Sequence, residues 1–221
     1  MRVFVVNAYP DRKEKYLKDK RYELFQAVHW TDVDHRDHDY GFYHNACDDH
    51  RNKVIACSLS HQKLLLQIIQ DGLEDVIIIE DDALLDFDRL DELKDINEFC
   101  YIGGLVVSIV LKDNLNFIKD GTKDIYRGCF EEGLNQIQFD NFKIGQTCGY
   151  YIPNPKVAEM ILDNIPARNK QKAIDVEYHF LQKKGLINKF IYPALVTLHI
   201  PDAKKGFTYS SYKLYDNQLH Y

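Results

Sequence analysis

The sequence lacks the features that mark several classes of protein. Its five cysteines are widely spaced without any Cys-x-x-Cys pair, and no Asn-x-Ser/Thr glycosylation site occurs. No apolar run approaches the roughly 20 residues of a membrane helix. The 28 Lys and Arg residues are scattered in a chain of net charge −6. We therefore expect reduced cysteines, no zinc knuckle, no membrane span and no nucleic-acid partner.

The sequence also has no internal repeat, no low-complexity segment and no evident interdomain linker. Its content of 45% hydrophobic and 13% aromatic residues is sufficient for a substantial core. We predict a single domain over residues 1–221. The N-terminus begins with an apolar strand rather than a signal peptide, so we expect a cytoplasmic protein.

One apolar run ends abruptly in three acids. Residues 76–79, Val-Ile-Ile-Ile, predict a strand buried on both faces, which is typical of a parallel or mixed sheet covered by helices. Glu80, Asp81 and Asp82 follow at the strand end where ligands bind in such sheets. These acids would repel one another and raise one another's pKa unless a hard divalent cation were shared among them. We therefore predict Mg²⁺ or Mn²⁺ there, with a phosphate-bearing ligand.

The surrounding pattern predicts an α/β fold with a mixed, mostly parallel sheet flanked by helices. Apolar positions over 52–70 follow helical spacing, and Gly72 ends that helix. Asn154 and Pro155 are a favoured cap and first residue of another helix. We also expect strands over 2–6, 22–30, 99–110 and 147–152, and helices over 12–20 and 175–184.

The acidic run has the Glu/Asp-x-Asp form that nucleotide-sugar enzymes use. Because side chains alternate along a strand, Glu80 and Asp82 are the predicted pair. Asp81 would then point the other way, toward a backbone amide, a helix N-terminus or a sugar hydroxyl.

Several motifs in this order together resemble glycosyltransferase family 25, which includes bacterial lipooligosaccharide galactosyltransferases and collagen galactosyltransferases. They are the first strand ending in Asn7, Cys57-Ser58-Leu59-Ser60-His61, the strand ending Glu80-Asp81-Asp82-Ala83, the segment Gly149 to Pro155, and Asp175. The resemblance spans most of residues 1–200. In size the chain is similar to small virus-encoded enzymes that glycosylate capsid protein.

The resemblance implies a GT-A-type fold and transfer, with inversion, from a UDP-sugar donor to a glycan or glycoprotein acceptor. Residues 1–110 would bind the donor, and 111–221 would form the acceptor half and a C-terminal tail. The implied donor-binding residues are Asn7, Arg12, Ser60, His61, Glu80 and Asp81. The implied ligands of Mn²⁺ or Mg²⁺ are Glu80, Asp82 and His199. The family's usual Asn-Leu and pair of Arg residues are not kept here, where Ala8-Tyr9-Pro10 follows Asn7.

An inverting transferase needs a carboxylate to take the proton of the acceptor hydroxyl. Asp175 is one candidate and Glu177 is the other. Asp175 could instead cap the helix that it begins, which is a common function of Asp.

Two other functions fit the acidic strand end. A metal-dependent phosphohydrolase would place carboxylates there too. The haloacid-type pattern needs an Asp nucleophile two residues before a second Asp, but this chain has Glu80 at the first of these positions and no Gly-rich phosphate loop. A non-catalytic sugar- or nucleotide-binding module of the same fold is the second alternative, and the presence of Glu80, Asp82 and Asp175 disfavours it.

Overall fold

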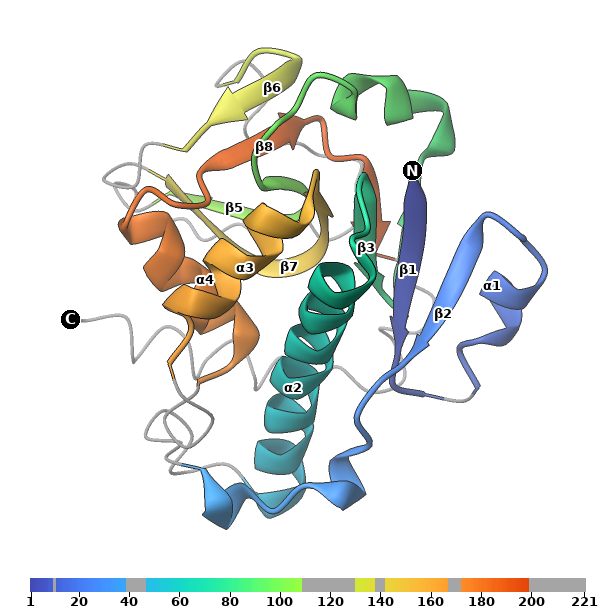
Figure 1. The fold of residues 1–221 in the computed structure, drawn as a ribbon, viewed down its shortest axis with the longest axis vertical. Coiled ribbons are helices and arrows are strands. Elements are labelled where there is room, and N and C mark those ends of the chain that lie inside the picture. The colour runs from blue at the N-terminus through green and yellow to red at the C-terminus, as the bar shows by residue number, and fades with distance from the viewer. Residues whose placement is uncertain (10, 39–46, 109–129, 138–141, 167–171, 199–221) are drawn as a thin grey trace.

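A seven-stranded sheet forms the centre of the molecule (Figure 1). The computed structural model describes residues 1–9, 11–38, 47–108, 130–137, 142–166 and 172–198. The strands of the sheet are β1 (Arg2–Asn7), β2 (Tyr22–Gln26), β3 (Val76–Glu80), β5 (Cys100–Ser108), β6 (Gly133–Gln136), β7 (Phe142–Ile152) and β8 (Lys189–Tyr192). Their order is β2-β1-β3-β7-β5-β8-β6, so both halves of the chain contribute to one sheet.

The sheet is mixed, and the predicted α/β class is confirmed. The pairs β1–β2, β1–β3 and β5–β8 are parallel. The pairs β3–β7, β5–β7 and β6–β8 are antiparallel. The segment expected to be extended over 99–110 contains the single strand β5, with register shifts between Tyr101 and Gly103 and between Gly103 and Leu105.

The strand β3 is buried on both faces, as its apolar run predicted. Val76 and Ile78 belong to the core cluster on one face of the sheet, and Ile77 and Ile79 belong to the cluster on the other. Glu80 follows Ile78 by two residues, so its side chain is directed toward the first of these faces.

Three helices cover that face of the sheet (Figure 1). They are α2 (Asp48–Asp71), α3 (Pro155–Asn164) and α4 (Ile174–Lys183). Gly72 ends α2 with a left-handed φ of 61°, and the Asn154 side chain accepts a hydrogen bond from the Val157 amide at 3.2 Å. Both predicted helix ends are therefore confirmed.

The opposite face packs against shorter elements. They are α1 (Glu14–Leu17), the 3-10 helix η3 (Phe87–Leu93), and a two-stranded sheet of β4 (Ala83–Leu85) and β9 (Val196–Leu198). The helix predicted over 12–20 is reduced to the single turn α1. Tyr16 is its one buried residue, so the segment has no apolar face along which a longer helix could pack.

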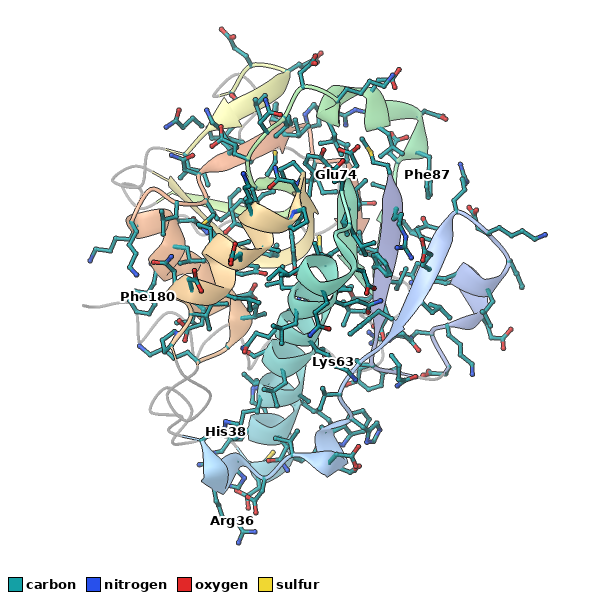
Figure 2. The ribbon with its side chains drawn as sticks, viewed as in Figure 1. Arg36, His38, Lys63, Glu74, Phe87 and Phe180 are labelled. Atoms are coloured by element: carbon teal, nitrogen blue, oxygen red, sulfur yellow. The ribbon has the colours of Figure 1, made fainter. Side chains whose placement is uncertain are left out.

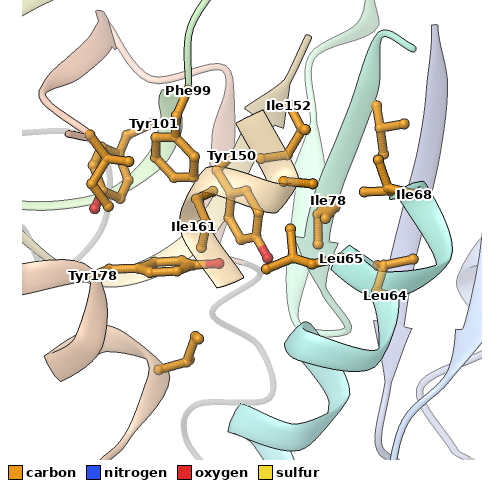
Figure 3. Packing of buried hydrophobic residues seen from close by; sticks show 14 of the residues in the cluster. Leu64, Leu65, Ile68, Ile78, Phe99, Tyr101, Tyr150, Ile152, Ile161 and Tyr178 are labelled. Atoms are coloured by element: carbon orange, nitrogen blue, oxygen red, sulfur yellow. The ribbon is translucent and has the colours of Figure 1, made fainter. Parts of the chain in front are cut away.

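Four aromatic side chains pack between the sheet and the helices (Figure 3). The Phe99 ring centroid lies 4.7 Å from that of Tyr101 and 5.2 Å from that of Tyr150. Tyr150 meets Tyr178 edge-on at 5.4 Å. Because all four side chains are buried, this packing fixes the position of the Tyr150 hydroxyl.

Two glycines allow β9 to lie directly on the sheet. A Cβ at Gly103 would stand 2.7 Å from the Val196 Cβ, and a Cβ at Gly149 would stand 2.8 Å from a Val196 methyl. The absence of side chains at these positions therefore sets the distance between β9 and the strands β5 and β7.

We expect Gly149→Ala to lower the free energy of unfolding by about 1–3 kcal/mol, because the added methyl overpacks against Val196. Adding Val196→Ala should recover part of this loss, since the nearest clashing atom is a Val196 methyl. Chemical denaturation measures both effects. Gly145→Ala is the matched control in β7, because no atom lies within 4 Å of its Cβ position. Equal losses for both glycines would contradict this account of the β9 contact.

Candidate active site

The predicted site lies where β3 ends beside the middle of α2. In Figure 2, Glu74 marks the edge at which β3 begins, and the strand runs from there toward the three acids. The Glu80 carboxylate is 35% exposed, and its Oε1 lies 3.8 Å from Nε2 of His61 on α2. The structure therefore brings together the two motifs predicted from the helix and the strand.

Asp81 is bound by the loop that follows β1. Its Oδ2 accepts hydrogen bonds from the amides of Ala8 at 2.8 Å and Tyr9 at 3.0 Å, and from the Asn7 side chain at 3.3 Å. Its Oδ1 accepts from the Arg12 guanidinium at 2.8 Å. Asp81 thus points toward backbone amides, as predicted, and its negative charge is paired within the protein.

Asp82 is much less well compensated. Its Oδ2 lies 3.6 Å from Arg12, and its buried Oδ1 has no hydrogen-bond partner among the described residues. Burial raises the pKa of Asp82, although Arg12 opposes that shift. Burial also raises the pKa of Glu80, and the charges of Asp82 and Asp81 raise it further. Two carboxylates with unbalanced charge and an unpartnered oxygen fit a hard divalent cation, which prefers oxygen ligands.

His61 is a buried, neutral imidazole. Its Nδ1 lies 2.6 Å from the Tyr150 hydroxyl, within hydrogen-bond distance. Its Nε2 faces Glu80 without a hydrogen bond to any described residue. Burial lowers the pKa of His61 to about 4, so the ring is uncharged at neutral pH.

The two candidate bases on α4 have different surroundings. Asp175 accepts a hydrogen bond from the Thr147 amide of β7 at 3.1 Å. Burial raises the pKa of Asp175 to about 6, and the nearby charge of Glu80 contributes. Glu177 is 3% exposed, and its Oε1 accepts from the Lys172 amide at 2.8 Å, just before α4. Asp175 therefore interacts with the site, whereas Glu177 holds the backbone at the start of its own helix.

Two buried serines of α2 fix neighbouring segments. The Ser60 hydroxyl donates to the Ala56 carbonyl at 2.6 Å and accepts from the Val28 amide at 2.9 Å. The Ser58 hydroxyl donates to the Lys172 carbonyl at 3.0 Å, which ties α2 to the segment before α4. Ser60, predicted to bind the donor, therefore makes both of these bonds within the protein. His199, a predicted metal ligand, and the tail after it lie outside the described residues.

Aromatic side chains follow the ends of β1 and β2. Tyr9 and Trp30 are partly exposed, with ring centroids 5.3 Å apart. The Arg12 guanidinium lies 4.5 Å from the Tyr9 ring centroid. The Arg12 guanidinium and these two aromatic rings therefore lie beside the acidic end of β3.

Sequence reasoning did not assign roles to Tyr150, Thr147 or Cys57. Tyr150 stands in the glycine–tyrosine segment, but its contact with His61 joins residues 89 positions apart, which no local pattern encodes. Thr147 donates to Asp175 through its backbone amide, so its residue type gives no sign of this contact. Cys57 shares a helix face with His61, and that spacing was the available signal.

Comparison with known families settles the broad class. The family model described as glycosyltransferase family 25 (LPS biosynthesis protein) matches residues 7–177. The chain belongs to glycosyltransferase family 25. It is therefore a glycosyltransferase, and membership implies a nucleotide-sugar donor and a glycan acceptor. A search of curated proteins finds no match.

The match to family 25 runs from Asn7 to Glu177, so it includes the acids of the site and His61 but not His199. The mixed sheet flanked by helices is consistent with a single GT-A-like domain. Within the described residues, no helix is both long and apolar enough to cross a bilayer.

The raised pKa of Asp175 predicts that this residue destabilises the metal-free protein at neutral pH. Its pKa of about 6 exceeds the usual value of about 3.9, so stability falls as pH rises from about 4 to about 6. Asp175→Asn should therefore unfold with a free energy about 1–3 kcal/mol higher than wild type above pH 6, and with little difference below pH 4.

Denaturation at several pH values, with a chelator present, measures this difference. Asp163→Asn, an exposed carboxylate on α3, controls for the loss of one negative charge. If the difference in unfolding free energy between Asp175→Asn and wild type does not depend on pH, the raised pKa of Asp175 is wrong.

Proposed function

We propose that this glycosyltransferase uses a UDP-sugar donor and Mn²⁺ or Mg²⁺, and that it transfers the sugar with inversion to a glycan or glycoprotein acceptor. The observation that carries the proposal is the buried Oδ1 of Asp82, which has no hydrogen-bond partner among the described residues. The charge of Asp82 raises the pKa of Glu80, and the charge of Glu80 raises that of Asp175, which supports placing the three acids in one site. Glu80 and Asp82 supply a cation site, and Asp175 supplies a base. In this proposal residues 1–110 bind the donor, and 111–221 form the acceptor half.

Glu80 and Asp82 would hold the cation, with His199 as a further ligand. When bound, the cation would neutralise charge on the diphosphate leaving group. Asp82 Oδ1 is a suitable ligand because it is buried and lacks a hydrogen-bond partner among the described residues. The backbone of Glu80 is held by β1, where Glu80 pairs with Val6, so the carboxylate is positioned by the sheet.

The donor would lie over the loop that Asp81 fixes. Asn7 and Arg12 bind Asp81 and thereby set the path of the chain through Tyr9. Tyr9 and Trp30 offer rings on which the uracil base can stack. Ser60 acts indirectly in this proposal, since its bond to the Val28 amide positions the segment that leads to Trp30.

Asp175 is the proposed base. At neutral pH a carboxylate with a pKa of about 6 is ionised, and it is basic enough to take a proton from a hydroxyl as attack proceeds. The acceptor oxygen bonds to the anomeric carbon, the bond from that carbon to the diphosphate oxygen breaks, and Asp175 takes the hydroxyl proton. The Thr147 amide holds the carboxylate in place for this step.

Release of UDP from a panel of UDP-sugars, with Mn²⁺ and simple sugar acceptors, tests the donor class. We expect wild type to release UDP only when metal is present, and Asp82→Asn to lose this release and metal-dependent UDP binding, because the uncharged amide is a poorer ligand. Asp86→Asn, at an exposed position after β4, is the control and should stay active. Metal-independent turnover by wild type, or full activity of Asp82→Asn, would rule out the cation site.

The base assignment predicts opposite results for the two acids of α4. Asp175→Asn should lower kcat by on the order of 10²–10⁴-fold, the usual contribution of a general base, while UDP binding stays near that of wild type. Glu177→Gln should leave kcat close to that of wild type, because the amide oxygen of Gln can still accept the hydrogen bond from the Lys172 amide. Steady-state kinetics and UDP titration separate these effects. If Glu177→Gln removes turnover and Asp175→Asn does not, Glu177 is the base.

A further inference from the structure

A second kind of metal site lies beside the proposed cation site. The Cys57 Sγ, a His61 ring nitrogen and a Glu80 carboxylate oxygen all lie within 4.8 Å of one another. Cys57 and His61 are four residues apart on one face of α2, and Glu80 projects toward them from the end of β3. We propose that these three side chains bind a borderline-soft divalent cation of the Zn²⁺ class.

The unpartnered nitrogen of His61 supports this proposal most directly. Nε2 is buried, has no hydrogen-bond partner among the described residues, and faces the Glu80 Oε1 at 3.8 Å. On the other side of the ring, the Tyr150 hydroxyl lies 2.6 Å from Nδ1. If Nδ1–H donates to the Tyr150 oxygen, the lone pair of Nε2 is available to a metal. Such a hydrogen bond to the far nitrogen is the usual support of a metal-binding His.

The spacing of the ligand atoms requires little adjustment. Bonds of about 2.0–2.3 Å in a tetrahedral zinc site separate ligand atoms by roughly 3.3–3.8 Å. The distance from Nε2 to Oε1, 3.8 Å, is already close to that range. Cys57 and Glu80 are only partly buried, so an ion can reach them from solvent. Binding would displace the proton of the Cys57 thiol, since the thiolate is the ligand.

The donor atoms distinguish this site from the oxygen site at Glu80 and Asp82. A thiolate and an imidazole select zinc-like ions, whereas carboxylates suit Mg²⁺ and Mn²⁺. Glu80 belongs to both sets, so an ion held by Cys57 would withdraw Glu80 from Asp82. If the proposed function is also correct, bound Zn²⁺ would inhibit Mn²⁺-dependent sugar transfer. That consequence rests on the proposed function, whereas Zn²⁺ binding itself does not.

Titration with Co²⁺, a spectroscopic substitute for Zn²⁺, tests binding without donor or turnover. Wild type should develop the sulfur-to-cobalt charge-transfer absorption, which Zn²⁺ then removes, and Cys57→Ser should not develop it. Cys47→Ser, at the exposed cysteine that precedes α2, is the matched control and should behave like wild type. Tyr150→Phe should weaken Zn²⁺ binding by roughly 10–100-fold, the usual effect of losing a supporting hydrogen bond.

A measurement on wild type covers the case in which Cys57→Ser fails to fold. Zn²⁺ should protect Cys57, but not Cys47, from alkylation, as mass spectrometry of the modified peptides would show. Absence of the cobalt band in wild type, an unchanged band in Cys57→Ser, or alkylation of Cys57 that Zn²⁺ does not slow would each overturn the proposal. These results do not depend on UDP or catalysis, so they stand apart from any failure of the transferase assay.

Discussion

Negative charge held at the end of a strand that is buried on both faces is the constraint on which this site depends. The strand β3 fixes the backbone of Glu80, and partial burial makes ionised carboxylates at this position unfavourable. The protein compensates one of the three acids internally. Asp81 accepts hydrogen bonds from two backbone amides and from the side chains of Asn7 and Arg12. Glu80 and Asp82 are left with raised pKa values, and a bound cation would offset the unfavourable free energy of ionising them.

The rest of the fold surrounds this end of β3 with groups from distant parts of the chain. The helix α2 supplies His61, β7 supplies the Thr147 amide and Tyr150, and α4 supplies Asp175. The aromatic packing around Tyr150 and the close contact of Val196 with Gly149 hold β7 in position. Substitutions in this scaffold should therefore affect the site by moving its side chains, not by changing their chemical groups.

Much of the fold could be predicted because its signals are local. The apolar run of β3, Gly72 at the end of α2, and Asn154-Pro155 at the start of α3 each carry their own physical cause. The short α1 and the pairing of β4 with β9 could not be predicted, since both depend on packing against the far face of the sheet. The predicted strand over 22–30 ends at Gln26 for a similar reason, because the segment after it is held by Ser60 of α2.

The site shows the same division between local and non-local signals. The strand β3 ends at Glu80, so the strand alternation used in the prediction does not extend to Asp81 and Asp82. Asp81 points toward the loop after β1 because the amides of that loop donate to its carboxylate. The sequence left Asp175 and Glu177 open, because two residues on one helical turn differ only in what lies opposite them. That difference is the Thr147 amide of β7 for Asp175 and the Lys172 amide for Glu177.

The central claim is that Glu80 and Asp82 bind a cation together with a diphosphate. Electron paramagnetic resonance of free Mn²⁺ during titration of the wild-type protein, with and without UDP, tests it most directly. Because coupling between two ligands is reciprocal, the account predicts that UDP tightens Mn²⁺ binding by roughly 5–150-fold. Mn²⁺ affinity that is unchanged by UDP, or no Mn²⁺ binding under either condition, would contradict it.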